Sequence, residues 1–376
     1  MYVPIIKNKN TELDIIKNHM TNFDGKIIPL IEIVSKQQKK IFHYEKGKRV
    51  LVEGLLGNKS YAIEDYSDVT LNSIRELAKI GLVFVQYFRY DFLTYQSDMD
   101  DDIREMAYKL AIDLDDYLFR TINLYSIDNV IPVFIIKPEV NNGDNLKNFY
   151  AAFSNLKLEG KRLAIRIDMR TVRRYTSQIN NILALFDSND FVFYDYLERK
   201  VSDLDLKYID FESVKSKKIV IHSYRKRDIV NFEYSVGEHE TAFDTKFMNE
   251  YRSLGFDGFG DFLGLPDNVP YSKARAKYSA AFIYDLEENK YISYRSEQTG
   301  KINQFTGRGG DPDFPKLRSM VLNSKRIRSK PQFDNCPGIE YINIKLINGG
   351  RFSHWKRVTV LCHLNAMLIK FSLIKK

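Results

Sequence analysis

The chain has 376 residues, of which 44% are hydrophobic and 28% are charged, and its formal net charge is +8. This composition is typical of a soluble globular protein, and the length suits one barrel with an appendage or two medium domains. No run approaches the roughly 18 apolar residues that span a bilayer, so we expect no membrane partner. Cys336 and Cys362 form neither a metal-binding spacing nor a disulfide framework, so we expect a cytoplasmic protein.

Nine short apolar runs, rich in β-branched and aromatic residues, are spaced along the first two-thirds of the chain. Such runs suit strands buried on both faces, as in a parallel sheet covered by helices. Helical periodicity between them, as in residues 69–80 and 102–118, indicates repeated strand–helix crossovers. The runs occupy residues 2–7, 27–32, 50–53, 82–86, 130–137, 163–168, 191–195, 219–222 and 256–261.

The pattern covers residues 1–265, close to the roughly 250 residues of a closed (β/α)8 barrel, so we predict a TIM-barrel-like α/β domain there. A closed (β/α)8 barrel has eight strands, so one of the nine runs must lie outside it. The candidates for exclusion are residues 50–54, because the connection before them is short, and 82–88, which also suit an edge or inserted strand. An open doubly wound sheet is the alternative.

The sequence pattern changes after Leu265. Residues 278–284 and 291–295 alternate in the manner of a hairpin, and residues 355–371 have the periodicity of a helix. No flexible linker precedes this part of the chain. We therefore predict that residues 266–376 form a C-terminal α+β appendage packed on the barrel.

Carboxylates end several runs, at the edge where barrel enzymes place their active sites. Glu32, Asp168 and Asp261 are candidate ligands for Mg²⁺ or Mn²⁺, which prefer oxygen ligands. Glu32 and Asp195 are candidate catalytic groups, and two separated carboxylates also suit glycoside hydrolysis. Polar residues are equally expected wherever strand ends meet solvent, so a structural role is the alternative for each.

Three further strand-end residues are catalytic or binding candidates. Lys7 and Lys137 would project from the same edge, where a lysine binds phosphate or acts as a base. His222 ends its run and suits proton transfer near neutral pH. The chain lacks Cys-x-x-Cys, His-Glu-x-x-His, a P-loop and a dinucleotide fingerprint, so we expect neither zinc nor a dinucleotide cofactor.

Basic residues cluster in three places, and Arg170, Arg225, Arg326 and Arg328 are candidate phosphate-binding residues from these clusters. If the clusters form one face, nucleic acid or a nucleotide is the expected ligand, and Arg326→Glu with Arg328→Glu should abolish salt-sensitive binding. A solvated basic surface without a ligand is the alternative.

The opening Tyr-Val-Pro-Ile-Ile-Lys, the Ile-Pro-Leu-Ile-Glu run ending at Glu32 and the Gly-Phe-Asp-Gly-Phe-Gly-Asp-Phe segment at 255–262 resemble the phage and bacterial "beta family" proteins and a related uncharacterised bacterial family. Residues 355–363 resemble the closing segment of that family, with Cys362 where a second histidine normally stands. The resemblance implies a barrel-like fold and occurrence on mobile elements and in regions of phage conflict.

Two functions follow as hypotheses. In the first, the protein is a hydrolase of a phosphate-containing substrate, a nucleotide or nucleic acid, with the strand-end carboxylates as metal ligands or acid–base groups. In the second, the barrel has no chemistry and is a binding or sensing partner of a co-encoded effector, recognising nucleic acid or phage protein. On the first hypothesis, Glu32→Gln removes activity and leaves the melting temperature nearly unchanged.

Overall fold

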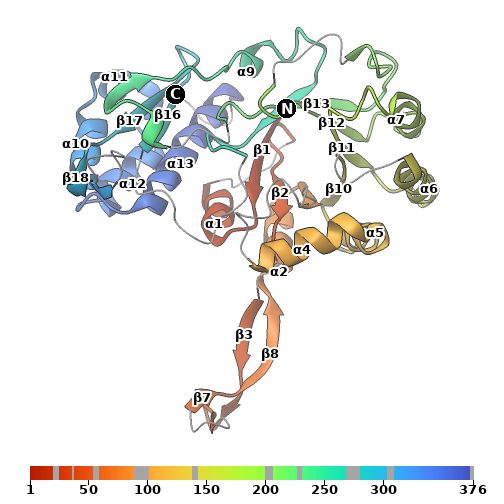
Figure 1. Ribbon diagram of the computed structural model, residues 1–376, viewed down its shortest axis with the longest axis horizontal. Helices are drawn as coiled ribbons and strands as arrows, with labels where there is room; N and C mark the ends of the chain where they lie inside the picture. Colours follow the sequence, from red (N-terminus) through yellow and green to blue (C-terminus); the bar gives the residue numbers. More distant parts are fainter. Residues whose placement is uncertain are drawn as a thin grey trace.

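A computed structural model of the chain describes residues 1–19, 25–35, 38–53, 59–88, 101–137, 143–199, 206–226, 231–267, 280–302 and 309–372. They form a barrel domain, a smaller appendage beside it, and an arm of β-strands that projects away from both (Figure 1).

The barrel is closed and consists of eight parallel strands, which confirms the predicted TIM-barrel-like α/β fold. Each strand is hydrogen-bonded to the next, and β15 returns to β1 to close the ring. In order around the barrel the strands are β1 (Tyr2–Lys7), β2 (Leu30–Ile33), β9 (Val83–Tyr87), β10 (Val130–Ile136), β11 (Ala164–Asp168), β12 (Phe191–Asp195), β13 (Lys217–Ile221) and β15 (Gly258–Asp261).

The ninth apolar run lies outside the barrel. As predicted, the run at residues 50–53 is excluded, because it forms β6 (Leu51–Glu53) of the arm. The proposed exclusion of residues 82–88 was wrong, since β9 pairs with both β2 and β10. The arm occupies the connection between β2 and the next helix, so β9 is the true third strand of the barrel.

Helices connect the barrel strands and cover their outer faces (Figure 1). The helix expected over residues 102–118 is two helices, because Asp113 has extended backbone and its carboxylate accepts a hydrogen bond of 2.9 Å from Asp116 N, which starts a new helix. The helical segments are α1 (Asn10–His19), α2 (Val69–Ala78), α4 (Asp101–Ile112), α5 (Leu114–Asn123), η1 (Leu124–Ser126), α6 (Gly143–Leu158), α7 (Thr176–Leu183), η2 (Asn231–Glu233) and α9 (Phe247–Glu250).

The appendage contains the predicted hairpin, β16 (Ala280–Asp285) with β17 (Lys290–Arg295), and the predicted last helix, α13 (Phe352–Lys370). The third strand of its sheet, β14 (Gly237–Glu240), precedes β15 in the chain and comes from the range assigned to the barrel. No helix in the described ranges is long and apolar enough to cross a membrane. The remaining elements are β18 (Gln298–Ile302), β19 (Gly309–Pro312), α10 (Phe314–Asn323), α11 (Lys325–Ser329), η3 (Pro331–Phe333) and α12 (Pro337–Lys345).

The arm consists of three antiparallel strand pairs. Its stem pairs β3 (Gln38–Phe42) with β8 (Ile63–Asp68). Its outer part carries two short hairpins, β4 (Tyr44–Glu45) with β5 (Lys48–Arg49), and β6 with β7 (Lys59–Tyr61).

Two layers of apolar side chains hold the barrel together. Alternate strand residues point inward, because successive side chains of a strand face opposite ways. The inward set forms one cluster, whereas residues of the opposite parity pack against the covering helices. The inward cluster consists of Val3, Ile5, Ile28, Leu30, Phe84, Ile131, Val133, Ala164, Phe191, Phe193, Ile219, Ile221 and Phe262.

The glycines of β15 allow the close approach of β1 that closes the barrel. A Cβ atom on Gly258 would lie 2.7 Å from the carbonyl oxygen of Met1, and one on Gly260 would lie 2.9 Å from that of Val3. Both neighbours are backbone atoms, so neither clash can be relieved by a change of rotamer.

We therefore expect Gly258→Ala to destabilise the protein by about 1–3 kcal/mol, because the added methyl group forces β1 and β15 apart. Urea unfolding followed by circular dichroism measures the change. Glu105→Ala, on the exposed face of α4, is the control and should stay within about 0.5 kcal/mol of the wild type. An equally small effect of Gly258→Ala would contradict the packing argument.

Candidate functional site

Polar and charged side chains take over the inward positions at the carboxyl end of the barrel. Lys7 continues the inward series of Val3 and Ile5, and Glu32 continues that of Ile28 and Leu30. The inward polar and charged side chains at this end are all buried, although they lie where the strands end. We call this set the mouth cluster: Lys7, Glu32, Gln86, Lys137, Arg166, Asp168 and Asp195.

Glu32 is the centre of the mouth cluster. Its carboxylate accepts hydrogen bonds from Lys7 Nζ at 3.0 Å, Gln86 Nε2 at 2.9 Å and Arg166 Nη1 at 2.7 Å. The side chain has no exposed surface. Buried charge is costly unless it is paired and hydrogen-bonded, and here both oxygens of the carboxylate are satisfied.

Arg166 joins Glu32 to Asp195. Its Nε and Nη2 atoms lie 2.8 and 2.7 Å from Asp195 Oδ2, while Nη1 binds Glu32. In the order around the barrel, β9 and β10 lie between β2 and β11, so the guanidinium crosses the mouth. It fixes the relative position of the two carboxylates.

The electrostatics of the cluster keep Lys7 cationic. Burial by itself lowers the pKa of Lys7, but the carboxylates of Glu32, Asp267 and Glu12 outweigh burial and raise it. A lysine of this kind binds anions and is a poor nucleophile. Burial raises the pKa of Asp195 even though Arg166 acts in the opposite direction, so this carboxyl group can hold a proton nearer neutral pH.

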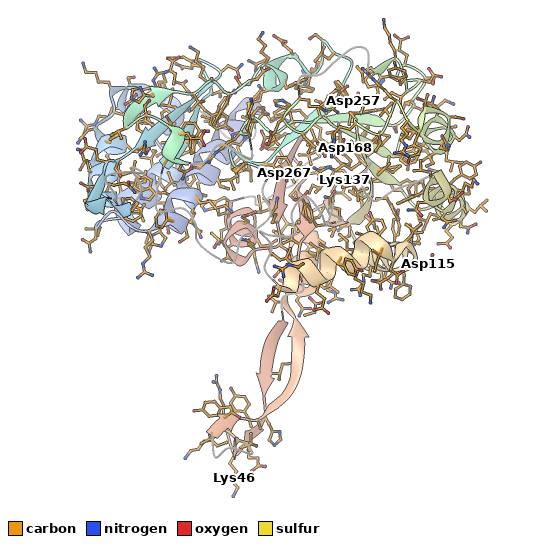
Figure 2. The ribbon with its side chains drawn as sticks, in the orientation of Figure 1. Lys46, Asp115, Lys137, Asp168, Asp257 and Asp267 are labelled. Carbon is orange, nitrogen blue, oxygen red and sulfur yellow. The ribbon has the colours of Figure 1, made fainter. Side chains whose placement is uncertain are left out.

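Asp168 and Lys137 complete the mouth. Asp168 is paired with Arg170, whose Nη2 lies 2.6 Å from Oδ2, so this predicted phosphate-binding arginine is engaged by a carboxylate. Lys137 Nζ lies 5.4 Å from the centre of the Phe88 ring and acts electrostatically on Asp195. Figure 2 shows Lys137, Asp168 and Asp267 together in the middle of the barrel domain.

Asp261 is not part of the mouth cluster. Its side chain lies on the same face of β15 as that of Phe259 and points out of the barrel towards the appendage. It accepts hydrogen bonds from Tyr2 Oη at 2.8 Å and Leu263 N at 2.9 Å, and His363 Nε2 of α13 lies 3.1 Å from Oδ2. Burial tends to raise the pKa of Asp261, but these partners outweigh it and lower the pKa.

The predicted metal ligands therefore do not converge. Glu32 and Asp168 face the interior with cations bound to them, whereas Asp261 faces the opposite way. Across the part of the chain that the structure describes, no three His, Cys, Asp or Glu side chains form a group able to hold a metal ion. The residues do not fit the predicted Mg²⁺ or Mn²⁺ site, and we derive no chemistry through one.

His222 and Arg225 lie between the barrel and the appendage, away from the mouth. The His222 ring packs on Tyr224 and Phe247. The Arg225 guanidinium lies 4.4 Å from the centre of the Phe282 ring, and Asn231 accepts its hydrogen bond. Strand alternation gives His222 its outward position, because Ile219 and Ile221 point inward.

Arg326 and Arg328 do not join the mouth either. Arg326 is paired with four carboxylates, those of Glu238, Glu240, Asp285 and Glu288. Arg328 Nε donates to the carbonyl oxygen of Leu322 at 2.8 Å, at the end of α10. The sequence shows no acid between the basic residues of 316–330, but the fold brings acids from β14 and the β16–β17 hairpin.

Sequence reasoning missed two members of the mouth cluster, Arg166 and Gln86. The signal for Arg166 was present, because an arginine two residues before Asp168 inside an apolar strand must share its face. Gln86 ends the strand whose place in the barrel was doubted. No protein-family model matches the chain, and no curated protein is significantly similar to it.

The sequence-based expectation that Glu32→Gln leaves stability unchanged conflicts with the structure, because the buried Glu32 carboxylate is bound to Lys7, Gln86 and Arg166. The substitution leaves Lys7 and Arg166 buried with less compensating charge, so we expect a loss of about 3–5 kcal/mol in the free energy of unfolding. Urea unfolding provides the measurement. The matched control is Glu76→Gln, which removes an exposed ion pair of 2.6 Å with Lys79 and should change the free energy of unfolding far less. Equal effects of the two substitutions would refute the role assigned to Glu32.

His222 makes stability depend on pH. Burial lowers its pKa from 6.5 to about 4, although Asp244 and Asp261 act in the opposite direction. Between these two values the unfolded chain binds more protons than the native one, so stability is retained above pH 6.5 and lost as the pH falls towards 4.

We expect His222→Phe, which keeps the ring packing, to recover about 2 kcal/mol of the stability lost between about pH 7.5 and about pH 5. Urea unfolding at the two pH values gives the difference from the wild type. A His222→Phe protein with the wild-type pH dependence would disprove the assignment.

Proposed function

We propose that the protein is a hydrolase that acts at the barrel mouth on a phosphate-containing substrate, a nucleotide or nucleic acid. The fold supports this proposal, since α/β barrels place their chemistry at the carboxyl ends of the strands. The observation that carries it is the Arg166 bridge, which holds Glu32 and Asp195 at fixed positions beside the cations Lys7 and Lys137.

Each mouth residue has a distinct role in the proposal. Lys7 and Lys137 attract the phosphate oxygens as point charges. Asp195 transfers the proton, because hydrolysis needs one group to accept a proton from the attacking water or to donate one to the leaving oxygen, and burial raises its pKa towards the working range. Glu32 and Arg166 are positioning residues, since their charged atoms are engaged with each other and with neighbours.

A binding or sensing function is the second candidate, and one observation favours it. The mouth carboxylates Glu32, Asp168 and Asp195 are each paired with a resident cation, as in a recognition scaffold. In this version, the protein is the sensor of a co-encoded effector and binds nucleic acid or a phage protein. Protection against phage is the biological setting that we propose for either version.

The test is to incubate the purified protein with nucleotides, cyclic dinucleotides and oligonucleotides, with Mg²⁺, Mn²⁺ or chelator, and to measure phosphate or nucleotide release. We expect turnover, and Asp195→Asn should lower kcat by about 100-fold or more because the proton-transfer group is lost. Lys137→Ala should mainly raise KM. Asp115→Asn, on α5 and remote from the mouth in Figure 2, should leave both constants unchanged.

Absence of turnover with every substrate, together with a ligand-induced rise in melting temperature, would reject the hydrolase and favour the sensor. Plaque assays on cells that express the wild type and Asp195→Asn then measure the biological role. Protection that survives Asp195→Asn would exclude catalysis at the mouth as its cause.

A further inference from the structure

The arm is a large exposed feature that the mouth chemistry does not use. It is inserted between β2 and α2, so it leaves the barrel from the carboxyl end of the strand that carries Glu32. Figure 1 shows the β3–β8 stem pointing away from the body, and Figure 2 places Lys46 at its far end. We call β4, β5, β6 and β7 with their exposed side chains the arm tip.

The root of the arm is built into the barrel. Asn8 is buried at the end of β1, and its Oδ1 accepts a hydrogen bond of 2.9 Å from Val34 N. Its Nδ2 donates to Ser35 O at 2.6 Å and to Thr70 Oγ1 at 2.9 Å. One side chain therefore holds the chain on both sides of the insertion.

The arm tip exposes aromatic rings around an arginine. Tyr44 is 53% exposed and Tyr61 is 46% exposed. Arg49 Nε donates to Tyr44 Oη at 3.1 Å, and the guanidinium lies 5.5 Å from the centre of the Tyr61 ring. The contact joins the two hairpins of the tip into one surface of flat groups, the Tyr44–Arg49–Tyr61 platform.

The arm tip also carries a net positive charge. Residues 44–61 contain four basic residues, Lys46, Lys48, Arg49 and Lys59, and two acidic ones, Glu45 and Glu53, which gives the arm tip a net charge of +2. Lys46, Lys48 and Arg49 are exposed beside the platform.

Charge and stacking together select the occupant of this surface. Proteins that hold single-stranded nucleic acid combine positive charge along the backbone with aromatic or arginine planes on which bases stack. The exposed apolar residues Leu51 and Val52 also suit a protein contact, but a second copy of this chain would bring two tips of charge +2 together. The charge therefore favours a polyanion.

We propose that the arm tip binds single-stranded nucleic acid, with bases stacked on the Tyr44–Arg49–Tyr61 platform and phosphates neutralised by Lys46 and Lys48. The proposal does not depend on hydrolysis at the mouth. It places the nucleic acid on an element whose root, Val34 and Ser35, is held by Asn8 and lies two and three residues after Glu32.

Fluorescence anisotropy with a labelled oligothymidylate, a matched single-stranded RNA and a matched DNA duplex tests the proposal. The wild-type protein should bind the single strands, and binding should weaken as salt rises from about 50 to 200 mM. Tyr44→Ala with Tyr61→Ala should weaken binding at least about tenfold, because base stacking is lost. Tyr44→Phe should retain binding, since the ring remains.

Lys46→Gln with Lys48→Gln should reduce the slope of log affinity against log salt by about 1.4, which corresponds to two phosphates of a single strand. The matched controls are Tyr150→Ala on α6 and Lys325→Gln with Lys345→Gln on the appendage, all exposed and away from the arm. They should bind as the wild type does. Wild-type binding of single strands together with absence of turnover would reject the hydrolase alone, which separates this proposal from the proposed hydrolase.

Failure of the wild-type protein to bind single strands would overturn the proposal, as would tip variants that bind as tightly as the wild type. Preferential duplex binding would replace stacking by groove recognition and would equally reject it. A dimer in light scattering that Tyr44→Ala with Tyr61→Ala dissociates, without any nucleic-acid binding, would show that the tip is an interface between copies.

Discussion

The pairing of Arg166 inside the barrel mouth is the interaction on which the site depends. A buried guanidinium is tolerated only where carboxylates neutralise it, and Glu32 and Asp195 do so from opposite directions. These carboxylates come from β2 and β12, which lie on either side of the three strands β9, β10 and β11. The bridge can form only in a closed barrel, so fold and site are specified together.

Strand alternation divides the polar strand ends into two sets with different tasks. Inward residues such as Glu32 form the mouth, whereas outward residues such as Asp261 join the barrel to the appendage. His363 contacts both Asp261 and Tyr2, and its Nδ1 lies 2.6 Å from Tyr291 Oη. The same buried network therefore includes β1, β15, β17 and α13, and Lys356 adds an ion pair of 2.6 Å to Glu12.

The insertion after β2 adds an exposed arm without changing the barrel. Loops at the carboxyl ends of barrel strands tolerate long insertions, because the ring of strands carries the stability. Here the inserted chain pairs with itself, and Asn8 fixes its root. The arm leaves the barrel at the carboxyl end of β2, the end of the barrel at which the mouth cluster lies.

The barrel itself was predictable from the sequence. A strand buried in a parallel sheet has a nearly continuous run of apolar residues in the sequence. The alternation of side chains along a strand also predicted that Glu32 shares a face with Ile28 and Leu30. The final helix and the β16–β17 hairpin followed from periodicity in the same way. The arm was not foreseen, because residues 50–53 have the composition of a buried strand, and nothing local shows that the segment is exposed.

The sequence by itself determined the fold class and the residues that end each strand, because both follow from patterns along a single strand. Only the tertiary structure decided which of those residues meet. Arg326 has no acidic neighbour in the sequence, but β14 and β16 place Glu240 and Asp285 within ion-pair distance of it. Asp261 was predicted to bind a metal together with Glu32, but its side chain points out of the barrel and pairs with His363. Partners far apart in sequence are set by strand register and closure, and these are properties of the whole barrel.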